Sequence, residues 1–535
     1  MSPRSAIYRF DYRRSAYQDA REVVRHTVVV VGAGPVGLTA AIDLALHGIA
    51  VVLLDDSDRI GDGSRGICYA KRTLEILDRL GLGERLVAKG VTWKLGKIYL
   101  RDQIVVSFDL LPEDGHKMPA FINLQQFYLE KALVDRATEV GAVDLRWRNR
   151  VVGVEPRNDV VRLTIETPDG NYQIDVDWVI AADGARSSVR DLLKLSFAGI
   201  AFEDKFLIAD VRMAADLPTE RRFWFDPPFH PGGSALMHRQ PDNVWRIDLS
   251  LGPDADAEAE QAPDRVVPRL KKVLGDTPFE LEWVSLYRFH CRRLDRFIHG
   301  RVIFAGDAAH QVSPFGARGG NSGMQDAENL AWKLAAVLEG EAPQALLDSY
   351  DRERRQAADE NIGYSTRATD FVSCRDAADV RLRNAVLSLC SGAEFARRMV
   401  NTGRLSTPTV HDSPLSTLDE ASFAGDARLG APAPDAPILT PAGRDGFLLE
   451  RLGGAFDLLY VRDGAAPRAP DGIRLHVIGD DLIDRSGLFA RRFDATPGAA
   501  YLFRPDQHLC ARWRRFDPAK VEAARDRALG RHPHR

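Results

Sequence analysis

The feature that most constrains this chain is a glycine-rich turn between an apolar strand and a helix. Residues 27–31 form an uninterrupted run of Thr and Val, and the turn that follows reads Gly32-Ala33-Gly34-Pro35-Val36-Gly37. The segment from there to His47 is rich in Ala and Leu and predicts a helix. Strands of β-branched residues are typical of a parallel sheet buried on both faces. The sequence therefore predicts a βαβ unit, with its second strand at 50–54.

Such a turn is suited to the pyrophosphate of a dinucleotide, because its backbone allows close approach and the helix N-terminus favours an anion. We predict that the turn binds this group through Gly32, Gly34, Pro35, Val36 and Gly37. An acidic residue is expected about 20 residues further on, where it would bond a ribose hydroxyl. Asp55 ends the second predicted strand at close to that spacing. The combination predicts an adenine dinucleotide, either NAD or FAD.

A second glycine motif favours FAD. The predicted strand at 301–305 ends in Gly306-Asp307, and the loop after it runs from Pro314 to Asn321. An acid at a strand end can bond the ribityl hydroxyls of a flavin. A glycine loop can bring backbone N–H groups to the pyrimidine edge of the flavin, and the helix that follows would point its positive end at the ring.

Together with Asp183-Gly184 between them, these motifs resemble the single-component FAD-dependent aromatic hydroxylases, the para-hydroxybenzoate hydroxylase and phenol hydroxylase family. The resemblance covers about residues 27–400. The segment 501–513 resembles the thioredoxin-like C-terminal domain of the phenol hydroxylase branch. In length and in this domain, the chain is most similar to the 3-(3-hydroxyphenyl)propionate hydroxylase-like subgroup. The loop 315–321 differs from the usual loop of that enzyme, so the resemblance does not assign its substrate to this chain.

The resemblance implies a mixed α/β fold, with a Rossmann-like FAD-binding domain, an inserted β-sheet substrate domain and a thioredoxin-like C-terminal domain. The expected boundaries are a leader at 1–26, FAD-binding segments at 27–195 and 299–404, the substrate domain at 196–298, a linker at 405–441 and the C-terminal domain at 442–535. A small substrate-side insertion is expected at about 90–120. The C-terminal domain lacks a CxxC pair, which favours packing or homodimer formation over a redox role.

The resemblance also assigns roles around the FAD. It places Asp55 at the adenosine ribose, Arg65 beside the phosphates and the flavin, and Gln126 on the ribityl chain. Asp183 and Gly184 would support FAD and a transient NADH or NADPH. Gly306 and Asp307 would meet the ribityl chain, and the isoalloxazine would be wrapped by Pro314, Gly316, Gly319, Gly320 and Asn321.

Three residues are the candidates for catalysis. Arg318 would place a fixed cation beside the reduced flavin, which is anionic. Pro314 lies in the same loop, and His238 in the sheet domain is a candidate for activating the substrate. Other substrate-side candidates are Trp224, His230, Arg246 and Tyr287, whereas Cys68, His290, Arg292 and His310 are expected to be structural.

The implied function is a monooxygenase that uses NAD(P)H, O2 and a flavin C4a-hydroperoxide to hydroxylate a phenolic ring. The substrate would be a 3-(3-hydroxyphenyl)propionate-like compound or another substituted phenol. Two alternatives stay open. One is a non-catalytic FAD-binding or regulatory protein, and the other is a flavin enzyme of the same fold that acts on a non-phenolic substrate.

Composition excludes other classes of protein. The formal net charge of −4 lacks the basic excess of a nucleic-acid binder. The longest uncharged apolar run, 27–42, is too short to span a membrane and is broken by glycines and a proline. The five cysteines form no CxxC pair, which argues against a disulfide framework, a zinc site or any other metal site. The expected location is the reducing cytoplasm.

Overall fold

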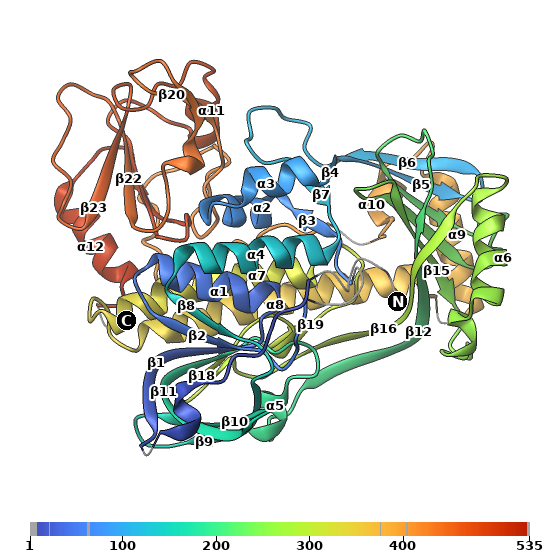
Figure 1. The fold of residues 1–535 in the computed structure, drawn as a ribbon. Coiled ribbons are helices and arrows are strands. Elements are labelled where there is room, and N and C mark those ends of the chain that lie inside the picture. Colours follow the sequence, from blue (N-terminus) through green and yellow to red (C-terminus); the bar gives the residue numbers. More distant parts are fainter. Residues whose placement is uncertain (1–7, 21, 61–64, 375, 403–404, 532–535) are drawn as a thin grey trace.

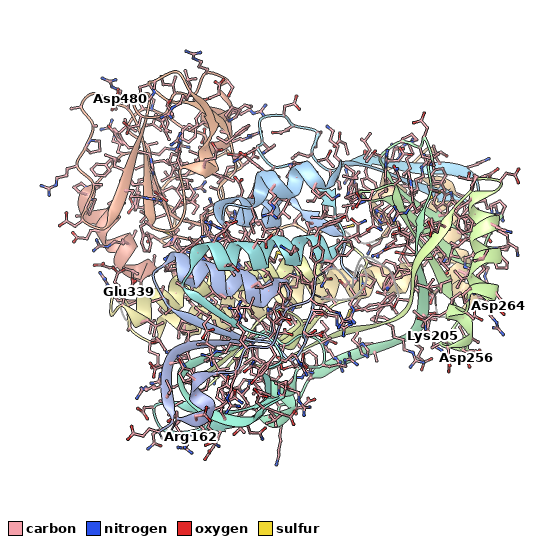
Figure 2. The ribbon with its side chains drawn as sticks, viewed as in Figure 1. Arg162, Lys205, Asp256, Asp264, Glu339 and Asp480 are labelled. Carbon is pink, nitrogen blue, oxygen red and sulfur yellow. The ribbon has the colours of Figure 1, made fainter. Side chains whose placement is uncertain are left out.

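The computed structural model describes residues 8–20, 22–60, 65–374, 376–402 and 405–531. Three regions of the molecule carry separate sheets (Figure 1). In Figure 2, Arg162 marks the first sheet region, Asp264 the second and Asp480 the C-terminal one. Long helices run between these regions and join them.

The first sheet assembles strands that are far apart in the sequence. Its order is β17-β18-β11-β1-β2-β8, with β10 and β9 paired beyond β11. These strands are β1 (Val24–Val31), β2 (Val51–Leu54), β8 (Val143–Arg146), β9 (Arg150–Pro156), β10 (Val161–Thr167), β11 (Gly170–Ala181), β17 (Ile298–His299) and β18 (Val302–Phe304). β1 pairs in parallel with both β2 and β11, and the predicted βαβ unit is confirmed. The apolar faces of α1 (Pro35–Leu46), α4 (Gln126–Val140) and α7 (Gly319–Leu338) pack against this core.

The second sheet has the order β19-β16-β12-β15-β14-β13-β5-β6. Its strands are β5 (Leu95–Leu100), β6 (Gln103–Asp109), β12 (Ala198–Arg212), β13 (Arg221–Phe225), β14 (Ser234–Arg239), β15 (Val244–Leu251), β16 (Glu280–Arg293) and β19 (His310–Gln311). β5 and β6 come from the region expected as a small insertion, and β5 pairs in parallel with β13. The segment expected as an insertion thus extends the second sheet.

The two faces of this sheet differ in what covers them. On the outer face, Met237, Trp245 and Ile247 pack against Val266 and Leu270 of α6 (Pro263–Leu274). The inner face is turned toward a small sheet of β3 (Cys68–Ala70), β4 (Val91–Trp93) and β7 (Phe121–Asn123). α2 (Lys71–Arg79) and α3 (Gly83–Lys89) follow β3, and α5 (Ser188–Leu192) follows β11.

The helices α8 (Leu346–Val372), α9 (Ala377–Leu389) and α10 (Glu394–Met399) lead to the segment expected as a linker. Within it, Leu415 and Ala427 are fully buried, so this segment is packed onto the protein. The C-terminal sheet has the order β23-β22-β24-β25, with β20 and β21 paired separately. Its elements are β20 (Pro437–Leu439), β21 (Asp445–Phe447), β22 (Phe456–Val461), β23 (Ile473–Ile478), α11 (Leu488–Phe493), β24 (Ala500–Phe503), β25 (Leu509–Trp513) and α12 (Pro518–Ala528).

The expected leader lies partly outside the described residues, namely at 1–7 and 21. Its described part lies against the first sheet region, where Phe10 stacks on Trp147 with ring centroids 4.4 Å apart. The Tyr12 hydroxyl donates to Thr167 Oγ1 over 3.2 Å. Across the described ranges, none of the helices has the length and apolar character that crossing a membrane requires.

Candidate functional site

The three glycines of the first turn have three different surroundings. A Cβ on Gly32 would lie 2.5 Å from the carbonyl oxygen of Ala182, and Gly32 has a φ of +103°. A Cβ on Gly37 would lie 1.9 Å from the oxygen of Gly32, so helix and turn are in close contact. A Cβ on Gly34 would meet nothing within 4 Å. A tight turn, close helix packing and open space at the helix N-terminus are what a bound pyrophosphate requires.

Asp55 supports this turn directly. Its carboxylate accepts hydrogen bonds from the backbone N–H of Ala33 over 2.6 Å and of Ser57 over 2.8 Å. Burial raises the pKa of Asp55 to about 6, although both backbone bonds favour the ionised form. The side chain therefore fixes the turn from the end of β2, next to the open space at Gly34.

The Asp183-Gly184 motif lies against the same turn. A Cβ on Gly32 would come within 2.8 Å of the Asp183 Cα, while one on Gly184 would meet nothing within 4 Å. The Asp183 carboxylate accepts from the hydroxyls of Ser187 and Ser188 and from the N–H of Val189. Its oxygens thus hold its own loop, and the open side of the motif is the backbone at Gly184.

The Gly306-Asp307 motif completes the group. A Cβ on Gly306 would lie 2.9 Å from Val36 Cγ2, so this motif contacts the first glycine turn. Asp326 of α7 holds it in place by accepting from Gly306 N–H over 3.0 Å and from His310 Nε2 over 2.7 Å. The half-buried Asp307 carboxylate has no hydrogen bond within the described ranges, and burial raises its pKa. It is therefore available to a ligand.

The loop from Pro314 to Asn321 divides into an exposed and a buried part. Pro314 and Gly320 are exposed, and a Cβ on Gly320 would meet nothing within 4 Å. The Asn321 amide accepts from Ala70 N–H and donates to the carbonyls of Cys68 and Ala317, which ties β3 to the start of α7. Asn321 thus holds the loop through its own contacts.

Arg318 is buried and is turned toward α8. Its guanidinium donates to Asn361 Oδ1 over 2.5 Å and lies over the ring of Tyr364, 4.7 Å from the centroid. It stands directly before α7, at the N-cap position. A role beside the flavin remains a prediction for this residue.

Gln126 contacts the residue that directly follows Arg65. Gln126 Oε1 accepts from Gly66 N–H over 2.9 Å, and its amide donates to Glu130. Arg65 is exposed. Burial and Asp307 raise the pKa of the Tyr287 hydroxyl to about 12, while Arg65 opposes this shift. Tyr287 lies on β16 of the second sheet, and its side chain is only partly buried, with 43% exposed.

The inner face of the second sheet carries a row of polar side chains. His238 of β14 is opposite Arg246 of β15, which is opposite Asp210 of β12. Arg246 and Asp210 form a bidentate pair at 2.9 and 3.0 Å. Arg221 begins β13 beside this row, and Asp248 lies on the same face of β15, two residues beyond Arg246. All of these except Asp248 are fully or nearly fully buried.

Several of these groups lack partners. His238 Nδ1 and Asp248 Oδ1 are buried without a hydrogen bond among the residues that the structure describes. Burial lowers the pKa of His238 well below its usual range, with Arg221 and Arg246 adding to the effect. Sequence reasoning selected His238 and Arg246 but missed Arg221 and Asp248. The alternation of apolar and charged residues in 244–249 was the available signal for Asp248, whereas 221–225 does not alternate and gives none for Arg221.

The other candidates lie elsewhere. Trp224 stacks on Tyr99 at 5.0 Å and lines an apolar pocket of about 400 Å³ on the outer face of the sheet. His230 Nε2 bonds the carbonyl of Ser250 over 2.7 Å. Arg292 bonds Gln311 on β19, and its guanidinium lies over the Phe197 ring.

Comparison with known proteins identifies the family. Residues 25–365 match the model of the FAD binding domain family, which is more than half of the chain. The chain belongs to this family. It is an FAD-dependent monooxygenase of the aromatic hydroxylase group, and the predicted fold class is confirmed.

Three relatives illustrate the range of the family. The chain is 31% identical to 6-methylpretetramide 4-monooxygenase of Streptomyces rimosus, over 93% of this chain and 92% of the relative. It is 26% identical to a 3-(3-hydroxy-phenyl)propionate/3-hydroxycinnamic acid hydroxylase of Mycolicibacterium smegmatis, over 90% and 89%. The solved structure of an anhydrotetracycline hydroxylase from Streptomyces rimosus superposes with a TM-score of 0.70 at 26% identity, covering 95% of this chain and 99% of that one. The resemblance to aromatic hydroxylases, the propionate hydroxylases among them, is confirmed.

Proposed function

We propose that this protein hydroxylates a phenolic ring with NADH or NADPH and O2. The observation that carries the proposal is the position of the inner sheet face. A buried row of polar side chains, which includes His238 and Arg246, shares this face with Phe206 and Phe223. Those two rings lie in one buried cluster with Phe315 of the loop that carries the second glycine motif. Such a face can orient an aromatic ring and its hydroxyl toward a flavin.

The residues present fit FAD. The pyrophosphate would lie at Gly34, where a Cβ would fill open space at the uncapped N-terminus of α1. Asp55 would face the adenosine ribose, and the unpartnered carboxylate of Asp307 would take a ribityl hydroxyl. The open backbone at Gly184 and Gly320 would allow close approach of the nicotinamide and the isoalloxazine. When bound, FAD would supply hydride acceptance from the nicotinamide and transfer of one oxygen atom from O2.

The side chains of the protein would position the substrate, exclude water from the reacting centre and supply charge. Phe206, Phe289 and Phe315 form a buried aromatic group where the loop 314–321 meets the second sheet. This group would keep water from the reacting centre. Candidate substrates are a 3-(3-hydroxyphenyl)propionate-like compound, another substituted phenol or a larger fused phenol.

Rapid-mixing reduction of the purified holoenzyme tests this function. NADH and NADPH are each mixed with the protein across a panel of phenols, and product is analysed for added oxygen. We expect one phenol to accelerate flavin reduction and to be recovered hydroxylated. A non-catalytic FAD protein would show neither effect, and an enzyme for non-phenolic substrates would respond to no phenol.

A second test addresses the FAD site alone. Gly34→Ala would place a methyl group in the space reserved for the pyrophosphate and should yield folded protein with little bound FAD. Gly392→Ala is the matched control, since its Cβ would also meet nothing within 4 Å but lies in an exposed turn after α9. Equal FAD content in both variants would contradict the assignment of Gly34.

A further inference from the structure

The inner sheet face holds a set of buried ionisable groups that the FAD motifs do not use. We call Arg221, His238, Arg246 and Asp248 the sheet-face cluster. Only one of the four, Arg246, has a carboxylate partner at hydrogen-bond distance within the described chain, namely Asp210. In the described chain, no hydrogen bond or ion pair connects Arg221, His238 and Asp248 to one another.

Arg221 is the most unusual member. It is 4% exposed, yet no ion pair of this arginine occurs in the described part of the protein. Among the residues that the structure describes, its only hydrogen bonds are two long contacts of 3.5 Å, to the hydroxyl and the carbonyl of Thr402. Burial lowers the pKa of Arg221 to about 10, with Cys68 and Asp248 opposing the shift. A buried guanidinium without a counter-ion is costly unless a ligand supplies one.

Asp248 is a carboxylate that likewise lacks a partner in the described structure. Oδ1 is buried without a hydrogen bond among the described residues, and no ion pair of its carboxylate is found there. Burial raises the pKa of Asp248 to about 7. Arg246 on its own strand and Arg221 on β13 favour the carboxylate, whereas Asp210 on β12 disfavours it. Within the described chain, Cys68 on β3 also lies near this carboxylate, and His238 is diagonal to it on β14.

Arg221 on β13 and Asp248 on β15 lie on the same face of the sheet, with β14 between them. Each shifts the pKa of the other, but no contact between them falls within the 4 Å of an ion pair. Rings flank the other two members of the cluster: Trp93 packs edge-on against His238, and Arg246 lies over Trp283. Phe223 and Ile98 continue the same face toward β5. This is the environment of a flat apolar ligand that carries one ionisable oxygen.

We propose that Arg221 and Asp248 bind the ring hydroxyl of the substrate between them, with Asp248 as the proton acceptor and Arg221 as the group that stabilises the oxyanion. The inference rests on the proposed function, in which the substrate is a phenol. Both residues then touch the substrate and are catalytic residues.

The step is a proton transfer without redox change. The phenolic O–H bond breaks, and the proton forms an O–H bond with the Asp248 carboxylate. The electron pair stays on the phenolic oxygen, where the Arg221 guanidinium donates to it. The resulting phenolate is more electron-rich and is the better acceptor of an electrophilic oxygen atom.

Binding of 4-nitrophenol to the oxidised holoenzyme tests the role of Arg221, because the phenolate of this probe absorbs visible light and the phenol does not. We expect Arg221→Gln to weaken binding of the phenolate roughly 10- to 100-fold, as loss of a charged hydrogen bond predicts. Arg222→Gln is the matched control, since Arg222 points to the outer face and bonds Glu220. Arg221→Lys keeps the charge and should recover part of the affinity.

Proton counting tests the role of Asp248. At about pH 8, free 4-nitrophenol is the phenolate and Asp248 is ionised. Placing the phenolate beside Asp248 should make the carboxyl take up one proton from solution in the wild type. Asp248→Asn cannot take up this proton, so binding should proceed without uptake. Calorimetric titration in two buffers of different ionisation enthalpy measures the difference.

The outcomes separate the inference from the proposed function. Equal affinity in Arg221→Gln and Arg222→Gln, or equal proton uptake in the wild type and Asp248→Asn, would overturn the inference. If the wild type hydroxylates a phenol in either case, the proposed function stands without it. If the wild type binds and hydroxylates no phenol, the proposed function itself fails.

Discussion

Two groups of charged side chains lie in different parts of this molecule, one on the second sheet and one at the C-terminal domain, and they are built in opposite ways. The sheet-face cluster leaves Arg221 and Asp248 without ion pairs in the described structure. The second group, which we call the junction network, consists of Lys333, Glu353, Arg504 and Asp506 where the C-terminal domain meets α7 and α8. Each of its members has at least one ion-pair partner.

The junction network shows what complete pairing looks like. Glu353 accepts from Lys333 over 2.8 Å and from Arg504 over 2.7 Å, and Arg504 donates to Asp506 over 2.6 Å. Burial disfavours the charged carboxylates of Glu353 and Asp506, but Arg504 at both sites and Lys333 at Glu353 favour them, and both pKa values lie well below their usual range. Paired charges of this kind fix the docking of one domain on another, whereas unpaired ones indicate a ligand site.

The largest expected effect is on the junction network. Glu353→Gln would leave the cations of Lys333 and Arg504 buried without their shared counter-ion. The free energy of unfolding should fall by about 3–5 kcal/mol, as expected when one partner of a buried pair is removed. Denaturant unfolding of the holoenzyme measures this loss.

An exposed pair provides the control for that variant. Glu394 and Arg398 pair on the surface with side chains 75% and 78% exposed, and Glu394→Gln should cost less than about 1 kcal/mol. If both variants lose the same stability, pairing in the junction network does not support the fold in the way described.

Removal of a charge from the sheet-face cluster should change the free energy of unfolding in the opposite direction. Arg221→Gln removes a buried charge that has no ion pair, so the ligand-free protein should become more stable, by roughly 1–3 kcal/mol. The same variant should lose affinity for phenolates. A loss of stability as large as that of Glu353→Gln would show that Arg221 is a structural residue. The sheet-face cluster and the junction network would then not differ in the way described.

The pH dependence of stability should also differ between the sheet-face cluster and the junction network. Asp248 has a raised pKa of about 7, so the folded state binds a proton more tightly than the unfolded state. Its contribution therefore decreases as the pH rises from about 4 to about 7, by up to about 1.4 kcal/mol per pH unit. Glu353 and Asp506 have lowered pKa values, so their contribution is present above the unfolded pKa and is lost in acid.

Unfolding measured for the wild type and Asp248→Asn at about pH 5 and about pH 7.5 isolates this effect. The variant should gain stability relative to the wild type as the pH rises. A difference that is constant with pH would contradict the raised pKa of Asp248.

The sequence was informative where local geometry carries the chemistry. The glycine turn, Asp55 and the two later motifs are each short segments whose spacing reflects a strand end or a helix start, and the structure brings them together around Val36 and Ala182. The Pro- and Ala-rich composition of the predicted linker does not reveal that Leu415 packs in a core. Helix α6 was missed because Pro268 interrupts its pattern.

The sheet-face cluster could not be predicted in this way. Arg221 and Asp248 stand on strands whose neighbours are set by register, and register depends on pairings between β13, β14 and β15. From the sequence, Arg221 and Arg222 are equivalent. Only the pairing of Arg222 with Met237 shows that Arg222 shares the outer face, which leaves Arg221 on the inner one.

The smallest expected effect concerns Cys68, which faces the cluster from β3. Its thiol donates to Asn123 Oδ1 over 3.2 Å, and burial raises its pKa to about 12, so it stays neutral. Cys68→Ser keeps a donor of similar size and should change the free energy of unfolding by less than about 1 kcal/mol. Phenolate binding should persist, because the charge that holds the ligand belongs to Arg221. If 4-nitrophenol binding were lost in Cys68→Ser but kept in Arg221→Gln, the electrostatic contrast between the two groups would not explain the site.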